Sequence, residues 1–167
     1  MYVKKDTGDK MFENLNHTLY TFIISMLPIV ELRGAIPVGC GFGLPFWECY
    51  LICVVGNLLP VPIILLFVRF VLSWMKTIRH LDKIAVWVEN KAHKHSAGIV
   101  KYASWGLYAF VAIPLPGTGA WTGALIAALL DMRMKKALPT IAAGVLTAGL
   151  LVGGISYGFL NFLKFLL

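Results

Sequence analysis

Apolar residues gather in four long blocks, which predict the membrane-embedded elements of the chain. The blocks are Leu19–Leu44, Phe46–Trp74, Leu107–Leu130 and Ala137–Leu163. Phe46–Trp74 carries charge only at Glu48 and Arg69, near its ends. Its terminal tryptophans are about 40 Å apart at helical rise, as expected of anchors at both headgroup layers. We therefore predict a spanning helix here, kinked at Pro60 and Pro62.

The last block is also predicted to span, because it runs mostly without charge to Lys164. Its Gly149-x-x-x-Gly153 and Gly154-x-x-x-Gly158 spacings place small residues on faces of the helix. Such spacings are typical of close helix packing rather than of ligand binding.

The first and third blocks are interrupted in the middle. In the first, the apolar run Leu19–Val30 gives about 18 Å of helix, half of a hydrocarbon core of ~30 Å, before the charged run Glu31–Pro37 begins. In the third, the prolines and glycines of Pro114–Gly119 cannot continue a regular helix. Because non-helical backbone at membrane depth needs protein or water around it, we interpret both blocks as broken helices or re-entrant hairpins. Two kinked full spans are the alternative.

The order of elements indicates an internal repeat. We expect a polar N-terminal segment (1–14), a first repeat (15–75), an amphipathic connector (76–104) and a second repeat (105–167). Broken helices in corresponding positions of two halves are typical of a transporter's binding site. The predicted fold class is an all-α integral membrane protein of two inverted repeats, each a broken or re-entrant helical hairpin followed by a spanning helix.

Basic residues cluster in the connector, which is therefore expected to be cytoplasmic. Its apolar positions recur at helical spacing, which predicts a helix lying on the membrane surface. The pair His93 and His95 is interpreted as part of a solvated loop rather than a metal site. If both broken blocks turn back, the basic loop 131–136 is cytoplasmic and the termini are outside; if all four blocks span, the loop is outside. The positive-inside rule supports both arrangements about equally.

Composition supports a membrane protein and excludes other classes. Hydrophobic residues make up 59% of the 167 residues and charged residues 14%, so a polar surface cannot cover the chain. Cys40, Cys49 and Cys53 lack metal or redox spacing and are expected to be small buried hydrophobes. The net charge of +7 resides mostly in the connector and loop 131–136, which favours an anionic membrane surface over nucleic acid.

Glu31 and Arg33 are the charges that stand out, because ionisable side chains at membrane depth are costly and tend to line cavities or ion paths. At i and i+2 they do not face each other on a regular helix, so a direct pair needs a break, which Gly34 and Pro37 suggest. A purely structural ion pair is one interpretation. In the functional one, Arg33 offers its donor fork to an anionic head such as phosphate. Burial favours the protonated form of Glu31, which then exchanges a proton in each transport cycle.

The second break carries no charge. Backbone N–H groups of its Pro-Gly-x-Gly turn, opening a helix at Ala120, form a candidate anion site, and a tight structural turn is the alternative. Asn57, beside Gly56, is expected to hydrogen bond to another helix in preference to substrate. The candidate substrate-binding residues are Glu31, Arg33, Gly34, Pro37, Asn57, Pro114, Pro116, Gly117, Thr118, Gly119, Trp121 and Thr122, with Glu31 also as the ion-coupling residue.

The two breaks resemble the bacterial family of small multidrug export proteins over roughly residues 15–160. The residues that carry the resemblance are the run Glu31-Leu32-Arg33-Gly34-Ala35-Ile36-Pro37, the glycines Gly39, Gly41 and Gly43, and the run Pro114-Leu115-Pro116-Gly117-Thr118-Gly119 with Trp121, Thr122 and Gly123. That family is distantly similar to the DedA, or VTT-domain, membrane proteins. These have two oppositely oriented re-entrant hairpins and are implicated in moving polyprenyl phosphate and other phospholipids.

The resemblance implies a transporter whose two hairpin tips meet at mid-membrane. DedA proteins typically carry an arginine shortly after the Pro-Gly of the second hairpin, where Thr118, Gly119 and Ala120 stand in this chain. If a phosphate is bound, Arg33 must therefore supply the cation alone.

The sequence contains no catalytic triad, metal-ligand spacing or phosphate-binding loop, so we expect no enzyme activity, cofactor or metal. We expect a multi-pass homodimeric transporter of the bacterial cytoplasmic (inner) membrane, in contact with membrane lipids and not with nucleic acid. Its substrate would be amphipathic or anionic, such as polyprenyl phosphate or a phospholipid, moved by alternating access with a proton or sodium ion.

Two other functions stay open. In a proton-coupled exporter of cationic drugs, Glu31 is the substrate carboxylate and Arg33 a competing cation. In a non-transporting membrane scaffold, the glycine-rich faces bind partners. The scaffold predicts that neutralising Glu31 and Arg33 leaves function intact, whereas changes at Gly149 or Gly153 abolish it.

Overall fold

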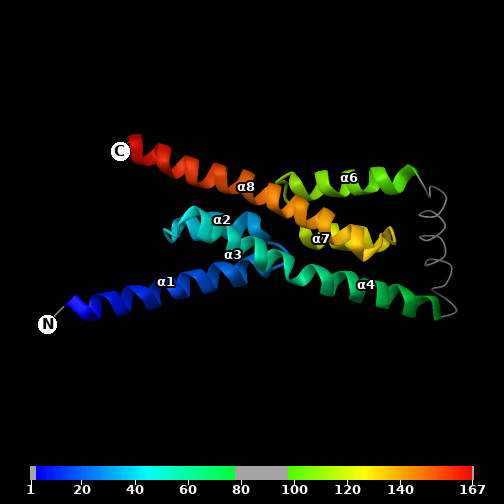
Figure 1. Ribbon diagram of the computed structural model, residues 1–167, viewed down its shortest axis with the longest axis horizontal. Helices are drawn as coiled ribbons and strands as arrows, with labels where there is room; N and C mark the ends of the chain where they lie inside the picture. The colour runs from blue at the N-terminus through cyan, green and yellow to red at the C-terminus, as the bar shows by residue number, and fades with distance from the viewer. Residues whose placement is uncertain (1–2, 78–97, 167) are drawn as a thin grey trace. The chain divides into compact units, whose positions relative to one another are not determined.

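The chain is all-helical in the parts that the computed structural model describes, residues 3–77 and 98–166 (Figure 1). The helices are α1 (Val3–Met26), α2 (Glu31–Gly41), α3 (Phe46–Leu58), α4 (Pro60–Thr77), α6 (Gly98–Ala112), α7 (Ala120–Leu129) and α8 (Met134–Leu166). Since these ranges contain no strand, the predicted all-α class is confirmed. Most of the predicted connector, with His93 and His95, lies outside the described residues.

Two stretches are long and apolar enough to cross a membrane, Phe46–Trp74 and Met134–Phe159. They agree with the two spanning helices predicted from the sequence. The first consists of α3 and α4, which are separated at Leu59 where the kink was predicted. The cause is chemical: Pro60 and Pro62 have no N–H with which to close the helical ladder. The inverted order of the repeats and their boundaries stay predictions.

The chain divides into two compact units, which are described separately. Unit 1 comprises Met1–Asn57 and Ala148–Leu167, and unit 2 comprises Leu58–Thr147. In unit 1, α2 turns back along α1 (Figure 1). His17 of α1 stacks on Phe42, just after α2, with ring centroids 4.4 Å apart. The two helices therefore form an antiparallel hairpin.

The turn of this hairpin lies earlier than expected. We expected the break at Gly34 and Pro37, but α2 continues through both, and the chain turns at residues 27–30. Pro28 explains the earlier turn, because a proline disfavours helical backbone in the residue before it. Pro37 costs α2 only its bond to the carbonyl of Arg33. The break predicted at Gly34 and Pro37 is therefore wrong.

Within unit 1, the part of α8 after Ala148 packs against α3 through small residues. A Cβ added to Gly149 would lie 2.8 Å from the Tyr50 ring, and one added to Gly153 would lie 2.6 Å from the Phe46 ring. Close packing is thus confirmed for the first glycine pair. Gly154 and Gly158 have open space around them in the described structure, so the packing predicted for the second pair is not found.

In unit 2, α6 and α7 form a second helical hairpin (Figure 1). A Cβ added to Gly123 of α7 would lie 2.6 Å from the side chain of Val111 in α6. Helix α7 ends at Leu129. Beyond it, Asp131 has a left-handed φ of 49°, and the N–H of Met132 donates to the carbonyl of Ala127 at 2.9 Å. The guanidinium of Arg69 in α4 donates a hydrogen bond to the carbonyl of Met132. This hydrogen bond connects α4 to the turn that follows α7.

Candidate functional site

An ion pair occupies the turn end of α2 in unit 1. Nη1 of Arg33 donates to Oε2 of Glu31 at 2.8 Å. Glu31 is 4% exposed, and the side chain of Arg33 is 16% exposed. The carboxylate is therefore buried, while part of the guanidinium still reaches the surface of the protein.

The backbone of Glu31 makes this pair possible. Its φ is 51°, in the left-handed region that a side chain with a Cβ enters at a cost of roughly 1–2 kcal/mol. A regular helix would point residues i and i+2 apart, and the left-handed residue redirects Glu31 toward Arg33. The expectation that a direct pair needs a break is confirmed, with the break at Glu31 itself.

The described side chains of Glu48 and His17 lie near the other end of α2. Oε1 of Glu48 accepts a hydrogen bond from Thr18 at 3.1 Å, and His17 stacks on Phe42 after the last turn of α2. Helix α2 has 11 residues and is about 16 Å long, so these groups are remote from Glu31. Arg33 is thus the basic partner of Glu31 in the described part of unit 1.

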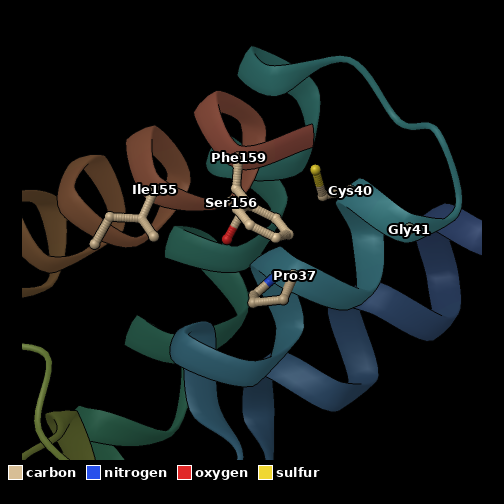
Figure 2. Close-up of a pocket in the computed structure, with 6 residues that line it drawn as sticks. All are labelled: Pro37, Cys40, Gly41, Ile155, Ser156 and Phe159. Carbon is tan, nitrogen blue, oxygen red and sulfur yellow. The ribbon is translucent and has the colours of Figure 1, made fainter. Parts of the chain in front are cut away.

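An apolar pocket of about 350 Å³ lies along α2 in the same unit. Figure 2 shows its lining: Pro37, Cys40 and Gly41 from α2, and Ile155, Ser156 and Phe159 from α8. Arg33, Pro37 and Gly41 follow one another at intervals of four residues, so they share one face of α2. That face has a cation near its start and an apolar pocket farther along.

The sequence did not single out the α8 side of this pocket. Ile155 and Phe159 look like any other apolar residues of a spanning helix, and only a helical wheel through Gly153 would have placed them near a packed face. A Cβ at Gly34 would lie 2.2 Å from the side chain of Val30, so the smallness of Gly34 allows the close turn before α2.

The second predicted group of residues forms a tight turn in unit 2. Gly117 has a φ of 84° and follows Pro116, as in a type II turn closed by the N–H of Thr118 on the carbonyl of Leu115 at 3.3 Å. The hydroxyl of Thr118 donates to the carbonyls of Ile113, at 2.8 Å, and Leu115, at 3.0 Å. Thr118 therefore holds the turn together.

Helix α7 begins at Ala120, as predicted. Gly119 caps it with extended backbone and provides no side-chain hydrogen bond, while Trp121 and Thr122 are half-buried in the first turn. Pro114 is half-buried as well. The ion pair belongs to unit 1 and this turn to unit 2, so each is a candidate site in its own right.

Asn57 is fully buried at the end of α3, and neither atom of its amide has a hydrogen-bond partner in the described structure. The hydrogen bond predicted to another helix is therefore wrong. Cys40, Cys49 and Cys53 are buried and form no disulfide with one another, as expected of small hydrophobes. No cluster of three metal-ligating side chains occurs among the described residues.

Two membrane-length apolar helices, several shorter helices and a buried ion pair define the class of this chain: a helical membrane protein with a charged pair in its interior. The chain belongs to the family described as "Putative small multi-drug export protein", which matches residues 31–151. The match begins at Glu31, directly after the first turn, and contains the turn at Pro114–Gly119. This membership indicates a membrane transporter. Comparisons with curated proteins and with solved structures gave no match.

Proposed function

We propose that the protein is a proton-coupled transporter of amphipathic anions, working by alternating access in the bacterial cytoplasmic membrane. The observation that carries this proposal is the shared face of α2, where Arg33 precedes the pocket at Pro37 and Gly41. An anionic head would bind Arg33 and an apolar chain would enter the pocket. A lipid phosphate has this chemistry.

Glu31 supplies the coupling in this proposal. When its carboxylate is ionised, it competes with the substrate for the guanidinium of Arg33. When it takes up a proton, Arg33 becomes available to an anion without leaving a buried charge unpaired. Proton binding and anion binding then favour each other equally, by linkage. The proton and the anion therefore move together.

We also propose that α2 and α7 are re-entrant. They have 11 and 10 residues, about 16 and 15 Å, which is half of a hydrocarbon core of ~30 Å. In unit 2, Arg69 lies five residues before Trp74 and donates to the carbonyl of Met132, which supports a cytoplasmic position for loop 131–136. Reaction of an Arg133→Cys protein with an external impermeant thiol reagent in cells would contradict this topology.

Flux in proteoliposomes tests the function. The substrate probe is a fluorescent dialkyl phosphate, and the competing probe is a cationic dye. We expect wild-type protein to move the phosphate in response to a pH gradient and to ignore the dye. Arg33→Ala should abolish movement, and Glu31→Gln should remove its dependence on the gradient.

Two results would replace this proposal. Dye-dependent proton flux that requires Glu31 and survives Arg33→Ala would support a cationic drug exporter. Intact cellular function in a protein with both Glu31→Gln and Arg33→Gln, together with loss of function in Gly149→Leu, would support a scaffold.

A further inference from the structure

Asn57 stands apart among the buried polar side chains of the described residues. These side chains are Thr21, Ser25, Glu31 and Asn57, and all belong to unit 1. Thr21 donates to the carbonyl of His17 at 2.8 Å. Ser25 donates to the carbonyl of Phe22 at 2.6 Å, and Glu31 is paired with Arg33. Asn57 alone in this set has both an unused donor, Nδ2, and an unused acceptor, Oδ1.

Asn57 lies in the last turn of α3, where that helix packs against α1. Its neighbour Gly56 lies against the last turn of α1, since a Cβ there would be 2.0 Å from Oγ of Ser25. The hydroxyl of Ser25 donates its hydrogen bond to the carbonyl of Phe22, and its oxygen still has lone pairs that can accept hydrogen bonds. The carbonyl of Gly56 is a second acceptor, because Pro60, four residues later, has no N–H to donate to it.

A buried amide without hydrogen-bond partners indicates which kind of ligand it can bind. A buried donor and acceptor without partners cost free energy, and in native proteins such groups bind protein, water or ligand. A bare cation would satisfy Oδ1 and leave Nδ2 unpaired. Only a molecule that both donates and accepts a hydrogen bond satisfies the whole amide.

We propose that the buried amide of Asn57 binds a hydrogen-bonding molecule at a hydrated position inside unit 1, with the hydroxyl of Ser25 and the carbonyl of Gly56 as candidates for further hydrogen bonds to it. The ligand is water or a hydroxyl or acid group of the transported molecule. The second source rests on the proposed transport function, whereas the first does not.

Cysteine labelling tests the proposal. Asn57→Cys is made with Cys40, Cys49 and Cys53 replaced by alanine, and is treated with 2-aminoethyl methanethiosulfonate in proteoliposomes. The thiolate attacks the reagent sulfur, forms a mixed disulfide and releases methanesulfinate, so only a hydrated thiol reacts fast. Val55→Cys, which is exposed on the outer side of the same helix, is the matched control.

We expect Asn57→Cys to react at least about tenfold faster than Val55→Cys. Equal rates, or a slower reaction at position 57, would overturn the proposal. If Asn57→Cys does not elute as a single folded species, Ser25→Cys provides the same comparison, because serine and cysteine are nearly isosteric.

Addition of a monoalkyl phosphate, whose monoanion carries a P–OH donor as well as acceptor oxygens, separates the two ligands. Labelling that slows in its presence assigns the position to a group of the substrate, and unchanged labelling assigns it to water. The labelling rates do not depend on transport. A wild-type protein that moves no phosphate would therefore contradict the proposed function and leave this test intact.

Discussion

At the scale of single residues, two residues other than glycine have left-handed backbone in the described ranges: Glu31 and Asp131. Asp131 occupies the position after a helix end where glycine is usual. Glu31 has no such local reason, and its strain persists together with the contact to Arg33. Strain held at a charged contact is typical of functional positions.

The pair at Glu31 predicts strong coupling between its two partners. Glu31→Gln and Arg33→Gln should each lower the free energy of unfolding by about 1–3 kcal/mol, because each leaves a buried charge without its partner. The double variant should be more stable than either single one. Thermal unfolding in detergent measures all four proteins. Additive losses would show that the pair contributes no coupling energy.

The left-handed backbone of Asp131 predicts that two small substitutions change the free energy of unfolding in opposite directions. Asp131→Gly should raise the free energy of unfolding by about 0.5–1 kcal/mol, since glycine adopts a φ of 49° without steric cost. Asp131→Ala should lower it by a similar amount, because alanine has no side-chain oxygen to favour this conformation. Denaturant titration of the two variants checks the signs, and a shift in the same direction for both would contradict the assignment.

At the scale of helices, contacts between α1 and α3 depend on Gly56. A Cβ there would be 2.0 Å from Oγ of Ser25 and 3.0 Å from the carbonyl oxygen of Phe22. The serine side chain is able to rotate, but the carbonyl is part of the backbone of α1. An added methyl group therefore forces the two helices apart.

Gly56→Ala should accordingly destabilise the protein by about 1–3 kcal/mol. Gly154→Ala is the matched control, since a Cβ at Gly154 meets open space and alanine favours helix by up to about 1 kcal/mol over glycine. Melting temperatures of the two variants in one detergent give the comparison. Equal melting temperatures would mean that α1 and α3 are not in the contact described.

The elements show what a sequence can predict and where it fails. Pro60 and the run Pro114–Gly119 broke helices where expected, because proline has no N–H for the helical hydrogen-bond ladder and glycine favours turns. Pro37 did not, since α2 loses one bond and keeps its other contacts with α1. Whether a proline breaks a helix or is tolerated in it depends on tertiary packing, which is absent from the local pattern.

The candidate site was likewise predicted in part. Glu31 and Arg33 stood out because charge in an apolar block is rare. The pocket residues Ile155 and Phe159 did not, because apolar residues look the same whether they line a pocket or face lipid. The unsatisfied amide of Asn57 was also beyond prediction, since hydrogen-bond partners are set by how the helices meet.

At the scale of the whole molecule, the central claim is that one cation, Arg33, serves a buried carboxylate and an anionic substrate in turn. The claim joins the ion pair, the adjoining apolar pocket and membership of a family of export proteins. It requires that anion binding take up a proton at Glu31. Binding should therefore tighten as the pH falls, and Glu31→Gln should bind with an affinity that does not change with pH.

Isothermal titration calorimetry with a short-chain dialkyl phosphate, which stays ionised throughout, tests the claim most directly. Repeating the titration in two buffers of different ionisation enthalpy gives the number of protons taken up on binding. We predict about one proton for each phosphate bound to wild-type protein, none for Glu31→Gln, and no binding to Arg33→Ala. Binding to wild-type protein without proton uptake, or undiminished binding to Arg33→Ala, would contradict the account.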